Sequence, residues 1–95
     1  MQKPRTSFSH TGKLEIFPMD AAWRYITIPE SKVPNVPRRG WGSVKLEVTV
    51  GGSTWQTSMF PYKGNYFIPI KQSVCKKEKL EVGKKFHVSY TAVGA

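Results

Sequence analysis

Apolar residues recur at every second position in several short segments, the period that puts one face of a β-strand on a core and the other in water. The clearest segment is Val44–Val50, where valine and leucine alternate with lysine, glutamate and threonine. Weaker versions of this pattern predict further strands over residues 8–17, 23–28, 53–60, 66–70 and 86–92. The alternation thus predicts six strands in all.

Glycine and proline residues mark the turns between these segments. Gly51 and Gly52 separate two predicted strands, and a glycine pair can take the positive φ angles of a tight type I′ hairpin. Residues 61–65 predict another turn, because Pro61 cannot donate to a strand ladder and Gly64 tolerates left-handed backbone. A third turn is predicted at residues 18–20.

Two segments do not alternate. Residues 29–42 contain three prolines and two glycines, which predicts an extended connection and the most mobile internal part of the chain. Residues 71–79 lack both residue types and are rich in helix formers, which predicts two turns of helix with Val74 and Cys75 facing inward. Residues 1–6 are expected to be a flexible N-terminus.

Together these elements predict an all-β fold: a closed six-stranded antiparallel β-barrel with one short helix before the last strand. Closure is expected because an open sheet would present two unpaired edges. The 95 residues are enough for one core, so we expect a single domain over residues 1–95 and no cleft between two domains.

The charge balance adds a question about partners. Fifteen lysines and arginines against six acidic residues give a net charge of +9, which favours anionic partners or simply solubility. The candidate contacts to an anion or to single-stranded nucleic acid are basic residues in two loops and the predicted helix: Arg38, Arg39, Lys63, Lys76, Lys77 and Lys79. Solubility or weak non-specific attraction is the favoured interpretation, and nucleic-acid binding stays as the alternative.

Residues suited to catalysis or metal binding are few. Cys75 is the only cysteine, which excludes an intrachain disulfide and a CxxC pair and favours a reducing, cytoplasmic compartment. His10 and His87 would be neighbours if the barrel closes between the first and last strands, but two solvated histidines are the favoured interpretation. No ligand spacing or catalytic triad is present, so we expect no metal, no cofactor and no enzyme activity. No apolar run is long enough for a membrane span or an export signal.

Trp41 lies between Gly40 and Gly42 in the predicted connection, where an aromatic side chain either plugs one end of the barrel or contacts a partner. Trp41, Tyr62 and Tyr66 are the candidate contacts for a ligand or a protein at the barrel mouth. The favoured hypothesis is a non-catalytic interaction module, monomeric or weakly dimeric, with an unknown ligand or protein partner. The core is expected to hold most other aromatic residues, among them Trp23, Trp55, Phe86 and Tyr90.

Several short motifs occur together in a characteristic order: residues 23–29, 39–40, 51–61, 64–70 and 82–88. With them the chain resembles, over residues 7–93, the domain-of-unknown-function family nineteen-zero-five. The resemblance implies small bacterial and archaeal proteins with this same closed barrel, some followed by a YdeI/OmpD-associated, bacteriocin-protection domain. It implies no activity, ligand or catalytic residue. The chain departs from the family pattern at Lys84, where an aspartate is usual, and in its proline-rich segment 29–37.

Overall fold

The structure is a computed structural model that describes residues 7–17, 23–34, 36 and 40–93. The predicted turn at residues 18–20 and the predicted flexible N-terminus at residues 1–6 lie outside the described residues. The described part is all-β with one short α-helix and two 3-10 turns. Its elements are β1 (Ser7–Lys13), β2 (Glu15–Ile16), β3 (Arg24–Ile28), η1 (Glu30–Lys32), η2 (Gly40–Gly42), β4 (Val44–Val50), β5 (Ser53–Tyr62), β6 (Asn65–Ile70), α1 (Gln72–Lys77) and β7 (Lys85–Ala92).

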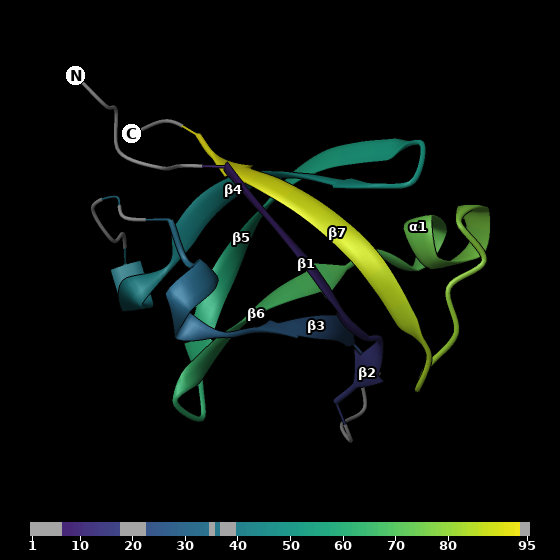
Figure 1. Cartoon of the computed structure of the whole chain (residues 1–95), viewed down its shortest axis with the longest axis horizontal. Helices are drawn as coiled ribbons and strands as arrows, with labels where there is room; N and C mark the ends of the chain where they lie inside the picture. Colours follow the sequence, from purple (N-terminus) through teal and green to yellow (C-terminus); the bar gives the residue numbers. More distant parts are fainter. Residues whose placement is uncertain (1–6, 18–22, 35, 37–39, 94–95) are drawn as a thin grey trace.

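The strands form one strongly curved sheet of seven strands in the order β1-β7-β4-β5-β6-β3-β2. Figure 1 shows this sheet as an open half-barrel, with α1 beyond one end of the strands. All pairs between named strands are antiparallel. The prediction of one short helix before the last strand is confirmed, and the prediction of a closed six-stranded barrel is wrong.

The sheet stays open because the first predicted strand is broken at Leu14. Residues on its N-terminal side pair with β7, whereas Glu15 and Ile16 pair with β3. Between them, the Leu14 amide donates to the Lys84 carbonyl at 3.1 Å and its carbonyl accepts from the Gly83 amide at 2.8 Å. The backbone groups at the break are therefore satisfied by the segment before β7, and no ladder runs from β1 to β3.

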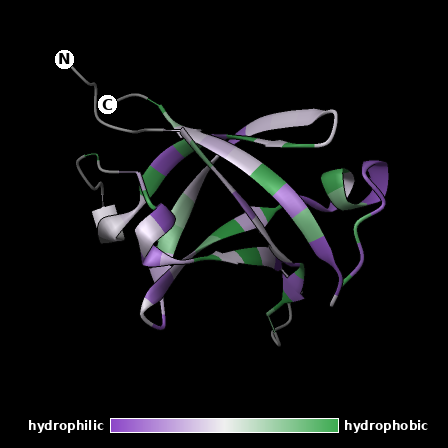
Figure 2. Ribbon diagram, viewed as in Figure 1, coloured by the Kyte–Doolittle hydropathy of each residue, from purple (hydrophilic) through white to green (hydrophobic). Residues whose placement is uncertain are grey.

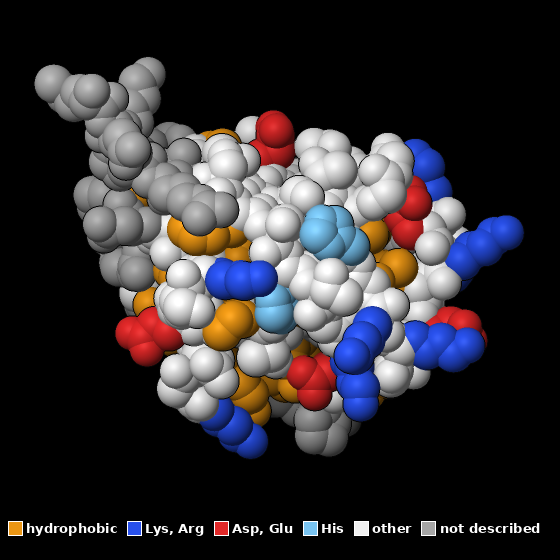
Figure 3. Space-filling model, in the orientation of Figure 1, with side chains coloured by type: hydrophobic (Ala, Val, Ile, Leu, Met, Phe, Trp, Pro, Cys, Tyr) orange, Lys and Arg blue, Asp and Glu red, His pale blue; other side chains and the backbone are white. Residues whose placement is uncertain are grey.

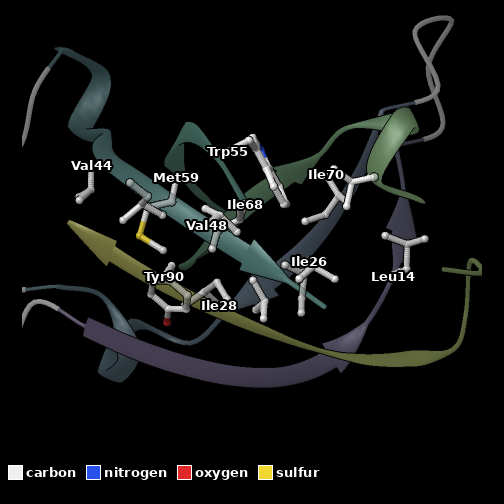
Figure 4. Packing of buried hydrophobic residues seen from close by; sticks show 14 of the residues in the cluster. Leu14, Ile26, Ile28, Val44, Val48, Trp55, Met59, Ile68, Ile70 and Tyr90 are labelled. Carbon is white, nitrogen blue, oxygen red and sulfur yellow. The ribbon is translucent and has the colours of Figure 1, made fainter. Parts of the chain in front are cut away.

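The core occupies the concave side of the sheet. Val44, Leu46, Val48 and Val50 are all buried there, which confirms the alternation predicted for this segment. Figure 2 shows polar and apolar bands alternating along β7, and Figure 4 shows the inward side chains of several strands meeting in one cluster. Val74 and Cys75 of α1 are also buried, as predicted. Trp23 is the exception among the residues expected in the core, since 54% of it is exposed.

The turn of the β4–β5 hairpin differs in type from the predicted one, whereas the turn of the β5–β6 hairpin falls within the predicted residues 61–65. At the β4–β5 turn only Gly51 has a left-handed φ, 56°, so this turn is not the predicted type I′ form. At the β5–β6 turn both central residues are left-handed, Lys63 at φ 50° and Gly64 at φ 80°, which is the type I′ pattern. Pro61 lies inside β5 opposite Tyr66 instead of in the turn.

The prediction of an extended connection between β3 and β4 is only partly correct, because the 3-10 turns η1 and η2 fall within it. Val33 and Pro34 follow η1 and are buried. The hydroxyl of Tyr90, on β7, donates a short hydrogen bond to the carbonyl of Lys32, and this bond ties the connection to the core. Burial raises the pKa of this tyrosine far above its usual range.

The left-handed backbone at Lys63 predicts a stabilising substitution. Lys63→Asn should raise the free energy of unfolding by about 0.5–1 kcal/mol, because asparagine tolerates this conformation better than lysine. Urea unfolding measures the difference. Lys63→Gln is the matched control: it also removes the cation that lies 5.2 Å above the Tyr62 ring, but it keeps the unfavourable backbone. Equal stabilities of the two variants would contradict the prediction.

The buried Tyr90 hydroxyl predicts a pH-dependent effect. Near pH 7, Tyr90→Phe should destabilise the protein by about 1–2 kcal/mol, since the Lys32 carbonyl loses its donor. Because the folded-state pKa is raised, the wild type should lose stability above about pH 10, where tyrosine ionises in the unfolded chain. The gap to Tyr90→Phe should therefore narrow at high pH. Urea unfolding at neutral and alkaline pH tests this, with the exposed Tyr62→Phe as control; a constant gap would refute it.

Candidate functional site

An open hollow lies where the ends of three strands meet the start of α1. We call it the tryptophan hollow; the residues that define it are Trp23, Arg24, Trp55, Ile70, Lys71 and Gln72. Its volume is about 330 Å³, and most of its lining is apolar. This size lies at the lower end of the range of small-molecule sites, roughly 300–1,000 Å³.

The strand register explains why these residues meet. Arg24, the first residue of β3, pairs with Ile70, the last residue of β6. Trp55 lies on β5 at a position that faces inward, on the same side of the core cluster as Ile70 (Figure 4). Lys71 and Gln72 follow directly as the chain leaves β6 and enters α1. The site is therefore built on strand ends, whose positions the sheet fixes.

Trp55 carries the most informative polar atom of the hollow. Only 9% of this residue is exposed, and its indole Nε1 is fully buried without a hydrogen-bond partner among the described residues. An indole N–H can only donate, and leaving such a donor unpaired costs about 1–3 kcal/mol. A hydrogen-bond acceptor that reached this N–H would remove the cost, and the residue that carries it is part of the lining of the hollow.

A second hollow adjoins the first. We call it the basic hollow; it is lined by Arg24, Gln72, Cys75, Lys76, Lys79, Leu80 and Glu81, and its volume is about 410 Å³. Arg24 and Gln72 line both hollows, so the two adjoin each other. Burial raises the pKa of the Cys75 thiol, although nearby Arg24 opposes the shift. Cys75 is therefore a packed thiol of low nucleophilicity.

The wall formed by α1 is held in place from the β4–β5 hairpin. Ser53, at the start of β5, is buried, and its hydroxyl donates to the Glu78 carboxylate at 2.7 Å. A side chain at Gly51 would collide with the same carboxylate, because its Cβ would lie 2.1 Å from Oε1 of Glu78. The close approach of Glu78 and the left-handed φ together require glycine at this turn.

Of the three residues expected at a barrel mouth, Tyr62 and Tyr66 lie on opposite faces of the β5–β6 hairpin. Tyr66 packs against the core, whereas Tyr62 lies on the outer face of the hairpin, opposite Asn65. Trp41 belongs to η2, but its side chain lies outside what the structure describes.

The candidate nucleic-acid contacts are also separated. Lys76, Lys77 and Lys79 lie together at α1, whereas Lys63 lies at the tip of the β5–β6 hairpin, far from α1 in Figure 1. Figure 3 shows cationic side chains gathering on the side where α1 lies. Arg38 and Arg39 lie outside the described residues. The groups that converge are therefore those near α1, and the prediction from sequence missed Arg24 and Lys71 among them.

The prediction from sequence also missed a cluster of aromatic side chains on the outer face of β3, β5 and β6. Its members are Phe17, Tyr25, Phe60, Tyr62 and Phe67. Phe17 stacks on Tyr25 with 4.1 Å between ring centroids, and Phe67 meets four of these rings. The rings cover one another, which accounts for aromatic residues at positions that face away from the core.

The two histidines do lie near each other, on β1 and β7. His87 pairs with Thr11, and its Nδ1 lies 3.0 Å from the threonine hydroxyl. Burial lowers the pKa of His10, with further contributions from Lys32 and His87. No group of three or more potential metal ligands occurs among the residues that the structure describes.

The chain belongs to a family defined by sequence, the domain of unknown function DUF1905, whose model matches residues 10–89. No curated protein and no solved structure matched the chain. Over the described ranges, no helix has both the length and the apolar character needed to cross a bilayer.

The hydrogen bond between Ser53 and Glu78, which holds α1 in place, predicts a local effect on the wall that α1 forms. Ser53→Ala should destabilise the protein by about 1–3 kcal/mol, because the half-buried Glu78 carboxylate loses a donor. It should also speed hydrogen exchange at the Glu78 amide, which donates to the Val74 carbonyl at 2.8 Å. Thr54→Ala, which breaks an exposed hydroxyl pair in the same hairpin, is the control and should have a smaller effect. Equal effects of the two variants would contradict this role.

Proposed function

We propose that this chain is a non-catalytic binding module whose ligand occupies the tryptophan hollow. The observation that carries the proposal is Trp55, which lines an open hollow and whose buried indole N–H has no hydrogen-bond partner among the described residues. Buried polar groups in folded proteins nearly always have a partner, and the exceptions call for an explanation. A bound ligand that accepts this hydrogen bond supplies one.

The rest of the lining suits a small apolar ligand. Trp23 lies at the edge with just over half of its surface exposed, and it can cover one side of a molecule that enters. Pro69 and Ile70 supply further apolar wall. An apolar hollow with one fixed polar contact is the usual form of a small-molecule site.

The chemistry of the lining supports binding rather than catalysis. The thiol of Cys75 is buried and its pKa is raised, so it is a poor nucleophile. His10 and His87 lie on β1 and β7 and line neither hollow. The remaining titratable groups of the two hollows are three lysines, Arg24 and a glutamate that pairs with Lys84. A buried free thiol also suits the cytoplasm, which we propose as the compartment.

The experiment is a titration with benzamide, a neutral aromatic compound with a carbonyl acceptor, followed by ¹H–¹⁵N NMR of the tryptophan side chains. The Trp55 indole N–H resonance should shift downfield as the hydrogen bond forms. The resonances are assigned with single tryptophan-to-phenylalanine variants. Trp55→Phe should abolish binding at unchanged or higher stability, because it removes the buried unpaired donor.

Trp41→Phe is the matched control, since η2 lies beside Pro61, near the end of β5 opposite to Trp55. It should bind benzamide like the wild type. Absence of any shift at the Trp55 resonance with benzamide and with its charged analogue benzoate would refute the proposed function. A shift at Trp41 that Trp55→Phe leaves intact would place the ligand in the connection between β3 and β4 and would also refute it.

A further inference from the structure

The tryptophan hollow and the basic hollow differ in character although they adjoin each other. The first is lined mainly by apolar and aromatic side chains, whereas the second contains the charged side chains of Lys76, Lys79 and Glu81. Resting on the proposed function, we infer that the ligand is a small aromatic compound with one anionic group, a carboxylate or a phosphate. Its ring lies in the tryptophan hollow and its anion beside Arg24, towards the basic hollow.

Arg24 lies between the two hollows, at the point where the ring and the anionic group of such a ligand would meet. It is half-buried and lines both hollows. No ion pair or hydrogen bond of its side chain is found over the described residues. A guanidinium offers planar pairs of N–H donors that fit a carboxylate or a phosphate. An arginine at the first position of β3, with no acidic partner among the described residues, is therefore suited to receive an anion.

The charges around Arg24 favour an anion over a neutral or cationic group. The two linings contain four cationic side chains, Arg24, Lys71, Lys76 and Lys79, and one acidic side chain, Glu81. Glu81 already pairs with Lys84 at 3.0 Å. The nearby carboxylate of Glu78 accepts from Ser53 instead of reaching these cations. Among the described residues, no acidic side chain forms an ion pair with these four cations, and a bound anion would neutralise part of their charge.

The position of Trp55 limits what the rest of the ligand can be. Its N–H needs an acceptor within hydrogen-bond distance at a site that is almost completely enclosed. An inorganic anion on the exposed lysines would not reach into an apolar wall, and a long polymer would not fit a hollow of about 330 Å³. A compact ring that carries its own acceptor satisfies both the apolar wall and the buried donor.

The test compares benzamide and benzoate, which have nearly the same shape and differ in charge, and adds phenyl phosphate to separate the two anionic groups. Binding is measured from the Trp55 indole N–H shift. At low salt, benzoate or phenyl phosphate should bind at least about tenfold more tightly than benzamide. This advantage should shrink when salt is raised from about 20 to about 300 mM, while benzamide binding should hardly change.

Two variants test the assigned cations. Arg24→Gln should remove the advantage of the anions, so that the ratio of anion affinity to benzamide affinity falls to about one. Lys76→Gln, on the exposed side of α1, should reduce the anion affinity by a smaller factor and serves as a second test if Arg24→Gln does not fold. Lys63→Gln removes the same charge at the far hairpin and should leave all affinities as in the wild type.

The outcomes separate the two proposals. If benzamide shifts the Trp55 resonance but benzoate and phenyl phosphate bind no more tightly, the anionic ligand is refuted and the binding module stands. If none of the three compounds shifts it, both proposals fail. If a short single-stranded oligonucleotide binds at the lysines of α1 without moving the Trp55 resonance, the basic hollow is a nucleic-acid contact and the inference is overturned.

Discussion

The architecture depends on the way the chain is held at Leu14. This residue is 1% exposed, and its two backbone groups bond to Gly83 and Lys84 rather than to a neighbouring strand of the sheet. One buried residue, held by its two backbone hydrogen bonds, therefore fixes the end of β1, the start of β2 and the approach to β7 at a single point. Because these backbone bonds are made inside the fold, the chain turns from one edge of the sheet to the other without leaving buried donors unpaired.

The segment between β6 and β7 takes its position from the same point. It leaves β6 at Ile70, is held to the β4–β5 hairpin through Glu78, and is fixed again where Gly83 meets Leu14. A connection attached at three places keeps α1 beside the strand ends although the helix has only 6 residues. Short helices have little stability of their own, so this support from tertiary contacts is what preserves the two hollows and the spacing of their charges.

The sequence predicts the strands that an alternating hydrophobic pattern marks, and it misses the features that depend on a single residue. The alternation around Leu46 and Val48 identifies a strand with one buried face, and the structure has that strand. Leu14 also fits an alternating pattern, so nothing in the pattern marks the break that opens the sheet. Trp23 and Trp55 are alike in residue type, but Trp23 lies just before β3 and is exposed, whereas Trp55 pairs with Val48 on the inner face of β5 and is buried. Arg24 could not be recognised as a site residue before Ile70 was known to lie beside it.

Trp55 shows why the hollow is better explained as a site than as imperfect packing. A phenylalanine on the inner face of β5 would fill much of the same space and would carry no donor to leave unpaired. The tryptophan thus carries a desolvation cost that a simpler apolar side chain would not, in a core whose other inward positions obey the strand pattern. Sites where a local rule is broken inside an otherwise consistent fold are where function is expected. Trp55 and the half-buried Arg24 line the same hollow, so two departures from ordinary packing occur in one depression.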